Sequence, residues 1–142
     1  MIYLDTGCLV KLYYPEPNSQ KVAAIIAGKP ICFNRLHELE FTNALHLKLF
    51  HGSAKPAQTQ AAAALVEADL KSGVLLPTVA NWEKIFRVAT DLARQHSGSF
   101  GCRSLDVLHC AFASVLGAGD FVSTDVRQKQ LAVAMGLNLI TF

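Results

Sequence analysis

The chain alternates between short runs that are wholly apolar and longer segments in which apolar residues recur every three or four positions. The short runs are typical of strands buried on both faces of a parallel sheet, and the longer segments are typical of helices that cover such a sheet. We therefore expect strands at residues 2–4, 30–33, 74–76, from 121, and 137–140. The alternation predicts an α/β sandwich, a four- or five-stranded, mainly parallel sheet between helices, in a single domain over residues 1–142.

Local signals predict where the intervening helices begin and end. Hydroxyl residues that can cap a helix stand before three of them, namely Thr6, Ser19 and Ser104. The helices are expected from about residue 9, and at 20–27, 36–50, 57–71, 81–96, 104–116 and 126–135. Residues 97–101, Ser-Gly-Ser-Phe-Gly, have the composition of a flexible loop.

The composition is that of a well-packed protein with a modest positive charge. Hydrophobic residues make up 51% of the 142 positions and charged residues 17%, which excludes a disordered chain. A net charge of +2 permits a nucleic-acid partner without requiring one. No secretory signal or membrane span is visible, and the four cysteines lack a C-x-x-C spacing. We expect a cytoplasmic protein with reduced thiols and no contact with a membrane.

Three aspartates stand where a strand or loop passes into a helix. Asp5 ends the first strand, Asp125 follows the fourth, and Asp106 comes two residues after Ser104. Each could merely stabilise a helix start, as a cap or by interaction with the helix dipole. However, parallel strands present their carboxyl ends at one edge of the sheet, where open α/β folds place their sites. We expect the three acids to share one pocket.

The fourth acid of this pocket is Glu38 or Glu40, both in the helix expected at 36–50. At about 100° per residue, Glu40 falls in an apolar stripe and Glu38 beside a narrower one. A carboxylate on a stripe that faces the core is costly unless it has a purpose, so we choose Glu40, with Asn43 as its support. The broader stripe consists of Leu36, Leu39, Ala44, Leu47 and Phe50, and the narrower one of Phe41, Leu45 and Leu49.

Carboxylates gathered without a lysine or arginine between them repel one another, and a divalent cation resolves this repulsion. Ligands that are all oxygen suit Mg²⁺, or Mn²⁺, better than zinc. Such ions promote attack of water on a phosphodiester. The four acids therefore point to metal-dependent hydrolysis of a nucleic acid.

Four blocks of the sequence resemble the PIN-domain family, and in particular its VapC-type toxins. They are YLDTGCLVKLY at 3–13, LHELEFTNAL at 36–45, CRSLDVLHCA at 102–111 and STD at 123–125. The resemblance implies a Mg²⁺-dependent endoribonuclease, the toxin of a toxin–antitoxin pair, with an antitoxin protein as partner and RNA as substrate. It implies catalytic and metal-binding roles for Asp5, Glu40, Asp106 and Asp125. Thr6 and Thr124 match hydroxyls that orient substrate, whereas Gly7 stands where the family commonly has serine.

Other residues leave alternatives open. Arg103 could hold an RNA phosphate or form a surface ion pair, and His109 is interpreted as a packed helix residue in preference to a catalytic base. A phosphotransfer enzyme with an aspartate nucleophile would need a second acid two residues after Asp5, where Gly7 stands. A catalytically silent PIN-like module that only binds a protein is the other alternative.

The helix at 36–50 also suggests an interface. Its narrower stripe, with Phe41 and Leu45, has no evident place in the core already served by the broader stripe. We expect a homodimer that also binds a small antitoxin, with this surplus as a protein interface, unless the helix at 57–71 covers it.

Overall fold

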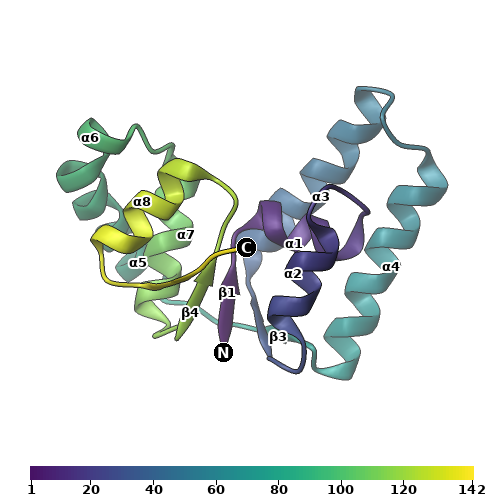
Figure 1. Ribbon diagram of the computed structural model, residues 1–142, viewed down its shortest axis with the longest axis horizontal. Coiled ribbons are helices and arrows are strands. Elements are labelled where there is room, and N and C mark those ends of the chain that lie inside the picture. The colour runs from purple at the N-terminus through teal and green to yellow at the C-terminus, as the bar shows by residue number, and fades with distance from the viewer. The chain divides into compact units, whose positions relative to one another are not determined.

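The computed structural model describes residues 1–142, which divide into two compact units (Figure 1). The first unit contains Met1–Asp5 and Val79–Thr141, and the second contains Thr6–Thr78 with Phe142. In the first, β1 (Ile2–Leu4), β4 (Asp120–Val122) and β5 (Asn138–Ile140) pair in parallel. In the second, β2 (Ile31–Phe33) pairs in parallel with β3 (Leu75–Pro77). All five expected strands are present, and the α/β class is confirmed.

Strands β1 and β4 form the centre of the first unit together with α7 (Ser104–Val115). Tyr3 and Phe121 are opposite one another in the register, and their rings stack at 5.7 Å. The Tyr3 ring also contacts Phe112 of α7, at 6.4 Å. Its hydroxyl hydrogen-bonds to Nδ1 of the buried His109, at 2.9 Å. His109 is therefore a packed helix residue, as expected.

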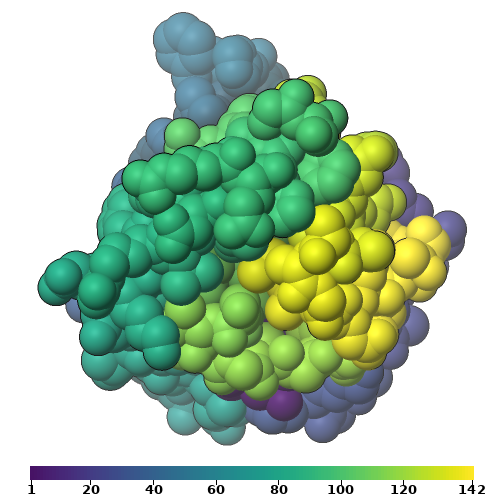
Figure 2. Space-filling model, turned by 90° about the vertical axis from the view of Figure 1, so that its left-hand side faces the viewer, coloured from purple at the N-terminus to yellow at the C-terminus, as the bar shows by residue number.

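The remaining helices of this unit are α5 (Trp82–Leu92), the π-helix η1 (Ala93–Ser97), the single turn α6 (Gly98–Phe100) and α8 (Val126–Ala134). Figure 2 shows the face on which the segment from α5 to α6 lies beside α8. The prediction of a flexible loop at 97–101 is wrong, because most of this segment is helical. The rings of His96 and Phe100 stack at 5.6 Å, and Gly101, at φ 66°, ends the turn.

The second unit is built around α1 (Thr6–Tyr13), which contacts α2 (Ser19–Ile26), α3 (Arg35–Phe50) and α4 (Pro56–Ser72). Helices α3 and α4 run side by side as a hairpin in Figure 1. The Tyr13 hydroxyl donates to Asp69 Oδ2 of α4 at 2.8 Å. Burial, and then this hydrogen bond, raise the pKa of Tyr13 far above its usual value, so the phenol stays protonated. None of the helices of either unit combines the length and apolar character needed to cross a membrane.

The three hydroxyl residues expected to cap helices are instead the first helical residues. The helices begin at Thr6, Ser19 and Ser104 themselves, and Asn18 and Arg103 occupy the N-cap positions of α2 and α7. In α7 the reason is the Asp106 carboxylate, which reaches back and accepts the backbone N–H of Arg103 at 3.1 Å. This bond fixes the helix start one residue earlier than Ser104 would.

The buried face of α3 differs from the one expected. Phe41 and Leu45 are only 4% and 3% exposed, whereas Leu39 is 65% and Phe50 82% exposed. Phe41 packs edge-on against the ring of Tyr13, with centroids 5.9 Å apart. The contact with α1 therefore buries the stripe that we had expected to be surplus. The prediction that Phe41 and Leu45 form a protein interface is wrong, because both are buried within the chain. The large apolar residues that α3 exposes are Leu39, Leu47 and Phe50.

The two faces of α3 should respond differently to truncation. Phe41→Ala leaves a cavity against Tyr13 and should lower the free energy of unfolding by about 3–5 kcal/mol. Leu39→Ala, on the exposed face, should change the free energy of unfolding of the monomer by less than about 0.5 kcal/mol. Urea denaturation followed by circular dichroism measures both. Equal losses for the two variants would contradict this description of the core.

Candidate functional site

The pairing of β1 with β4 brings two of the expected acids together. It continues one residue beyond β1, because the Asp5 N–H donates to the Val122 carbonyl at 2.9 Å. The hydroxyl of buried Ser123 donates to Asp5 Oδ2 at 2.5 Å and accepts the Asp125 N–H at 3.0 Å. One hydroxyl thus joins the acids at the ends of two strands.

Sequence reasoning missed Ser123 and chose its neighbour Thr124, which is exposed. The register would have identified the correct hydroxyl. Leu4 is opposite Val122, so the next residue of each strand brings Asp5 beside Ser123. The role of Thr124 in orienting substrate stays a prediction.

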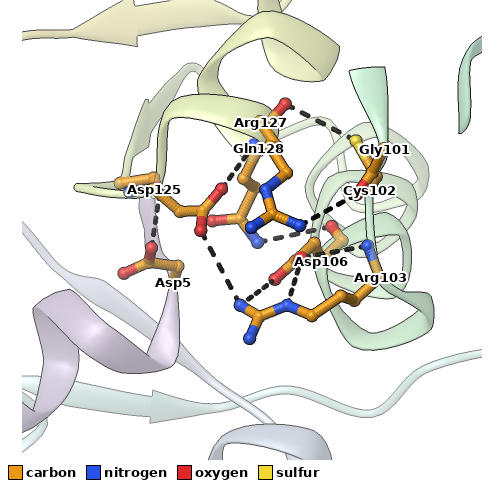
Figure 3. Close-up of polar contacts among 9 residues, drawn as sticks. Asp5, Gly101, Cys102, Arg103, Asp106, Asp125, Arg127 and Gln128 are labelled. Atoms are coloured by element: carbon orange, nitrogen blue, oxygen red, sulfur yellow. Dashed lines mark hydrogen bonds and ion pairs between the residues drawn. The ribbon is translucent and has the colours of Figure 1, made fainter. Parts of the chain in front are cut away.

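The third acid, Asp106, is bound by the arginine that precedes its helix. Arg103 Nε lies 3.0 Å from Asp106 Oδ2, and Arg103 Nη2 lies 3.3 Å from Oδ1. The same Nη2 lies 3.7 Å from Asp125 Oδ2, so the guanidinium bridges the two acids (Figure 3). We expected no lysine or arginine between the carboxylates, and this expectation is wrong. Arg103 and Asp106 are three residues apart at a helix start, and the capping geometry brings them together.

Gln128 connects α8 to both of these acids, and sequence reasoning missed it too. Its backbone N–H donates to Asp125 Oδ1 at 2.9 Å, and its side-chain Nε2 donates to the Asp106 carbonyl at 3.3 Å (Figure 3). The side chain is buried, and its Oε1 has no hydrogen-bond partner in the chain. Gln128 therefore fixes the starts of α7 and α8 relative to each other and leaves one acceptor beside the acids.

Two thiols, Cys102 and Cys110, lie near these acids and have raised pKa values. Burial raises the pKa of Cys102, and the negative charges of Asp106 and Asp125 raise it further. Burial also raises the pKa of Cys110 well above its usual value. Because the thiolate is the reactive form, the raised pKa of each residue favours the less reactive protonated thiol. All four cysteines are free, as expected.

The second unit contains the remaining acids. The Thr6 hydroxyl, at the start of α1, donates to Glu40 Oε2 of α3 at 2.8 Å, and Glu40 is partly buried. Glu38 is exposed and pairs with Arg35 at 2.5 Å. Of the two glutamates, Glu40 is thus the one with a polar partner on a neighbouring helix. The broader apolar stripe of α3, from which Glu40 was chosen, is nevertheless not the buried face of the helix. Asn43 is exposed, and its support of Glu40 stays a prediction.

The chemistry of the acids in the first unit fits a hard divalent cation, because Asp5, Asp106 and Asp125 offer only carboxylate oxygens. The structure does not gather three His, Cys, Asp or Glu side chains closely enough to hold a metal ion. In this unit the Ser123 hydroxyl stands between Asp5 and Asp125, and Arg103 stands between Asp125 and Asp106. The carboxylate oxygens suit a cation, and Ser123 and Arg103 lie between the residues that carry them.

The model of the PIN domain family matches residues 2–134. The chain belongs to the PIN domain family. The α/β fold expected from the resemblance is thereby confirmed, and no curated protein matches the sequence of this PIN domain.

Solved structures with the same fold include three bacterial proteins. VapC20 of Mycobacterium tuberculosis, described as a Sarcin-Ricin loop cleaving toxin, is 16% identical, with a TM-score of 0.69 over 96% of each chain. FitAcB of Neisseria gonorrhoeae is 16% identical, with a TM-score of 0.65 over 99% of this chain and 97% of the other. VapBC2 of Rickettsia felis, bound to a DNA fragment from its promoter, is 18% identical, with a TM-score of 0.64 over 99% and 98%. At these identities the likeness establishes the fold of this PIN domain.

The Ser123 hydroxyl should stabilise this PIN domain measurably. Ser123→Ala removes a donor from the buried Asp5 carboxylate and an acceptor from the Asp125 N–H, so it should lower the free energy of unfolding by about 1–3 kcal/mol. Thr124→Ala is the matched control, because that hydroxyl is exposed. Thermal and urea denaturation measure the difference. If the two variants are equally stable, Ser123 does not hold the acids as described.

Proposed function

We propose that this PIN domain is a metal-dependent endoribonuclease and the toxin of a toxin–antitoxin pair. The observation that carries the proposal is the polar network that joins Asp5, Asp106 and Asp125, which come from three separate segments of the chain. Buried and partly buried acids that share one polar network are costly, and a catalytic cation gives them a purpose. The toxin assignment draws on the likeness to VapC20, a described toxin, and to VapBC2.

In this proposal Asp5, Glu40, Asp106 and Asp125 hold Mg²⁺ or Mn²⁺. The bound cation supplies activation of water and neutralises charge on the phosphodiester. The chain's own residues orient the acids. Ser123 holds one oxygen of Asp5, the Gln128 backbone N–H holds one oxygen of Asp125, and Thr6 holds one oxygen of Glu40. These bonds orient three of the four carboxylates.

RNA is the proposed substrate, and the exposed groups around the acids can bind its phosphates. Arg103 is 69% exposed and offers a planar set of donors that matches a phosphate. Thr6, Asn43 and Thr124 are proposed to position the substrate, as the family resemblance implies. A cytoplasmic location follows from the proposed substrate and partner, and it agrees with four free thiols.

The proposal is tested by Asp5→Asn, which should abolish cleavage of RNA while keeping the fold. Replacing one carboxylate weakens cation binding and relieves repulsion, so the metal-free melting temperature should hold or rise. Glu38→Gln, in the exposed Arg35 pair, is the control and should retain most activity. Cleavage of a labelled RNA with Mg²⁺ or Mn²⁺, and after chelation with EDTA, gives the readout. Wild-type cleavage by Asp5→Asn, or no cation-dependent cleavage by the unaltered chain, would leave a silent binding module as the better description.

We also propose a homodimer, now on the exposed face of α3. Leu39, Leu47 and Phe50 lie on one side of the helix and are exposed, as expected of an apolar contact surface. The antitoxin is proposed as a second protein partner, by likeness to the VapBC2 structure.

Charge on this face should separate the subunits. The double variant Leu39→Glu, Phe50→Glu should be monomeric at micromolar concentration, with an unchanged circular dichroism spectrum. Val79→Glu is the control, because Val79 is fully exposed outside α3. Analytical ultracentrifugation distinguishes the states. A wild-type monomer at the same concentration rules the dimer out.

A further inference from the structure

We propose that Arg103 is an internal counterion that competes with the divalent cation for Asp106 and Asp125, so that the metal loads only as the guanidinium moves off these acids. The inference rests on the proposed function in one respect, namely that the cation binds at these carboxylates.

The contacts of Asp106 explain why Arg103 and a cation would compete for it. An ionised carboxylate has about four acceptor positions. Arg103 fills three of them, through its backbone N–H, Nε and Nη2, at 3.1, 3.0 and 3.3 Å. A cation that takes Asp106 as a ligand therefore meets the Arg103 guanidinium on both carboxylate oxygens.

At Asp125 the two oxygens have different partners. Oδ1 accepts the Gln128 N–H that caps α8, at 2.9 Å, and Oδ2 faces Arg103 Nη2 at 3.7 Å. The capping bond occupies the first oxygen, so Oδ2 is the one that can serve a cation. The Arg103 guanidinium thus lies between the Asp106 carboxylate and Asp125 Oδ2, the oxygens that could bind a cation (Figure 3).

The exposed fractions indicate which partner can move. The Arg103 side chain is 69% exposed, whereas Asp106 is 10% and Asp125 30% exposed. The acids are fixed by the starts of α7 and α8, while the Arg103 side chain is mostly exposed, and ion pairs of exposed side chains contribute little to stability. Displacement of Arg103 therefore needs no change in the fold. After displacement the planar Arg103 guanidinium stays beside the acids, where it can donate hydrogen bonds to the phosphate of the proposed RNA substrate.

The test is titration of the metal-free full chain with Mn²⁺ in an isothermal calorimeter, without RNA. Arg103→Ala should bind Mn²⁺ roughly 3- to 10-fold more tightly than wild type, since the competing charge is gone. Arg103→Lys, which cannot make the two-pronged contact, should fall between them. In thermal melts, saturating Mn²⁺ should raise the melting temperature of Arg103→Ala more than that of wild type.

Two controls separate competition from a general loss of positive charge. Arg127 lies near the same acids but donates to the Gly101 carbonyl at 3.2 Å, so Arg127→Ala should change Mn²⁺ affinity less than Arg103→Ala. Arg94 pairs with Asp91 three residues away, at 2.7 Å on an exposed surface, so Arg94→Ala should leave the affinity unchanged.

The outcomes distinguish this proposal from the proposed function. Equal or weaker Mn²⁺ binding by Arg103→Ala overturns the competition and leaves the metal site standing. An equal gain in Arg127→Ala also overturns it, because the effect would then be one of net charge. Binding by Arg103→Ala alone, with none by wild type, supports strong competition. No Mn²⁺ binding by any variant at millimolar concentration overturns both proposals.

Discussion

The candidate site depends on the parallel register of β1 and β4. With Leu4 opposite Val122, the next residue of each strand, Asp5 and Ser123, meet at the strand ends. The stacked rings of Tyr3 and Phe121 hold this register from within, and the Asp5 N–H bond to Val122 extends it to the site. A shift of one residue would turn each side chain to the other face of the sheet and separate Asp5 from Ser123.

The acids were open to two interpretations, as helix caps or as members of a functional site, and the structure shows capping bonds for Asp106 and Asp125. Asp125 caps α8 with Oδ1 and faces Arg103 with Oδ2. Asp106 accepts the first N–H before α7 and still binds the guanidinium. A carboxylate at a helix start is held by bonds to backbone donors and favoured by the helix dipole. Capping therefore orients these acids, and it helps to offset the repulsion between them.

The sequence was sufficient for features set by local patterns and insufficient for those set by packing. The strands and most helices were predicted because apolar runs and periodicity decide them. The buried face of α3 was not, because Leu39 and Phe41 are both large apolar residues, and contact with Tyr13 on another helix selects between them. Ser123 required the strand register, and the helical turn at 97–101 depends on ring stacking within a segment whose composition suggested a loop.

Arg103 completes the electrostatic balance of the first unit. Three carboxylates gather there with one guanidinium between two of them, so the metal-free protein is partly neutralised by its own chain. Exchange of a single positive charge for a divalent cation would neutralise the acids further, which favours the exchange electrostatically even though the Arg103 ion pairs are lost. The displaced guanidinium would then lie beside the proposed site for an RNA phosphate, where a positive charge is again favourable. In the proposed function the same residue would therefore balance the charge of the acids before the cation binds and attract the substrate afterwards, because the charge it faces changes from carboxylate to phosphate.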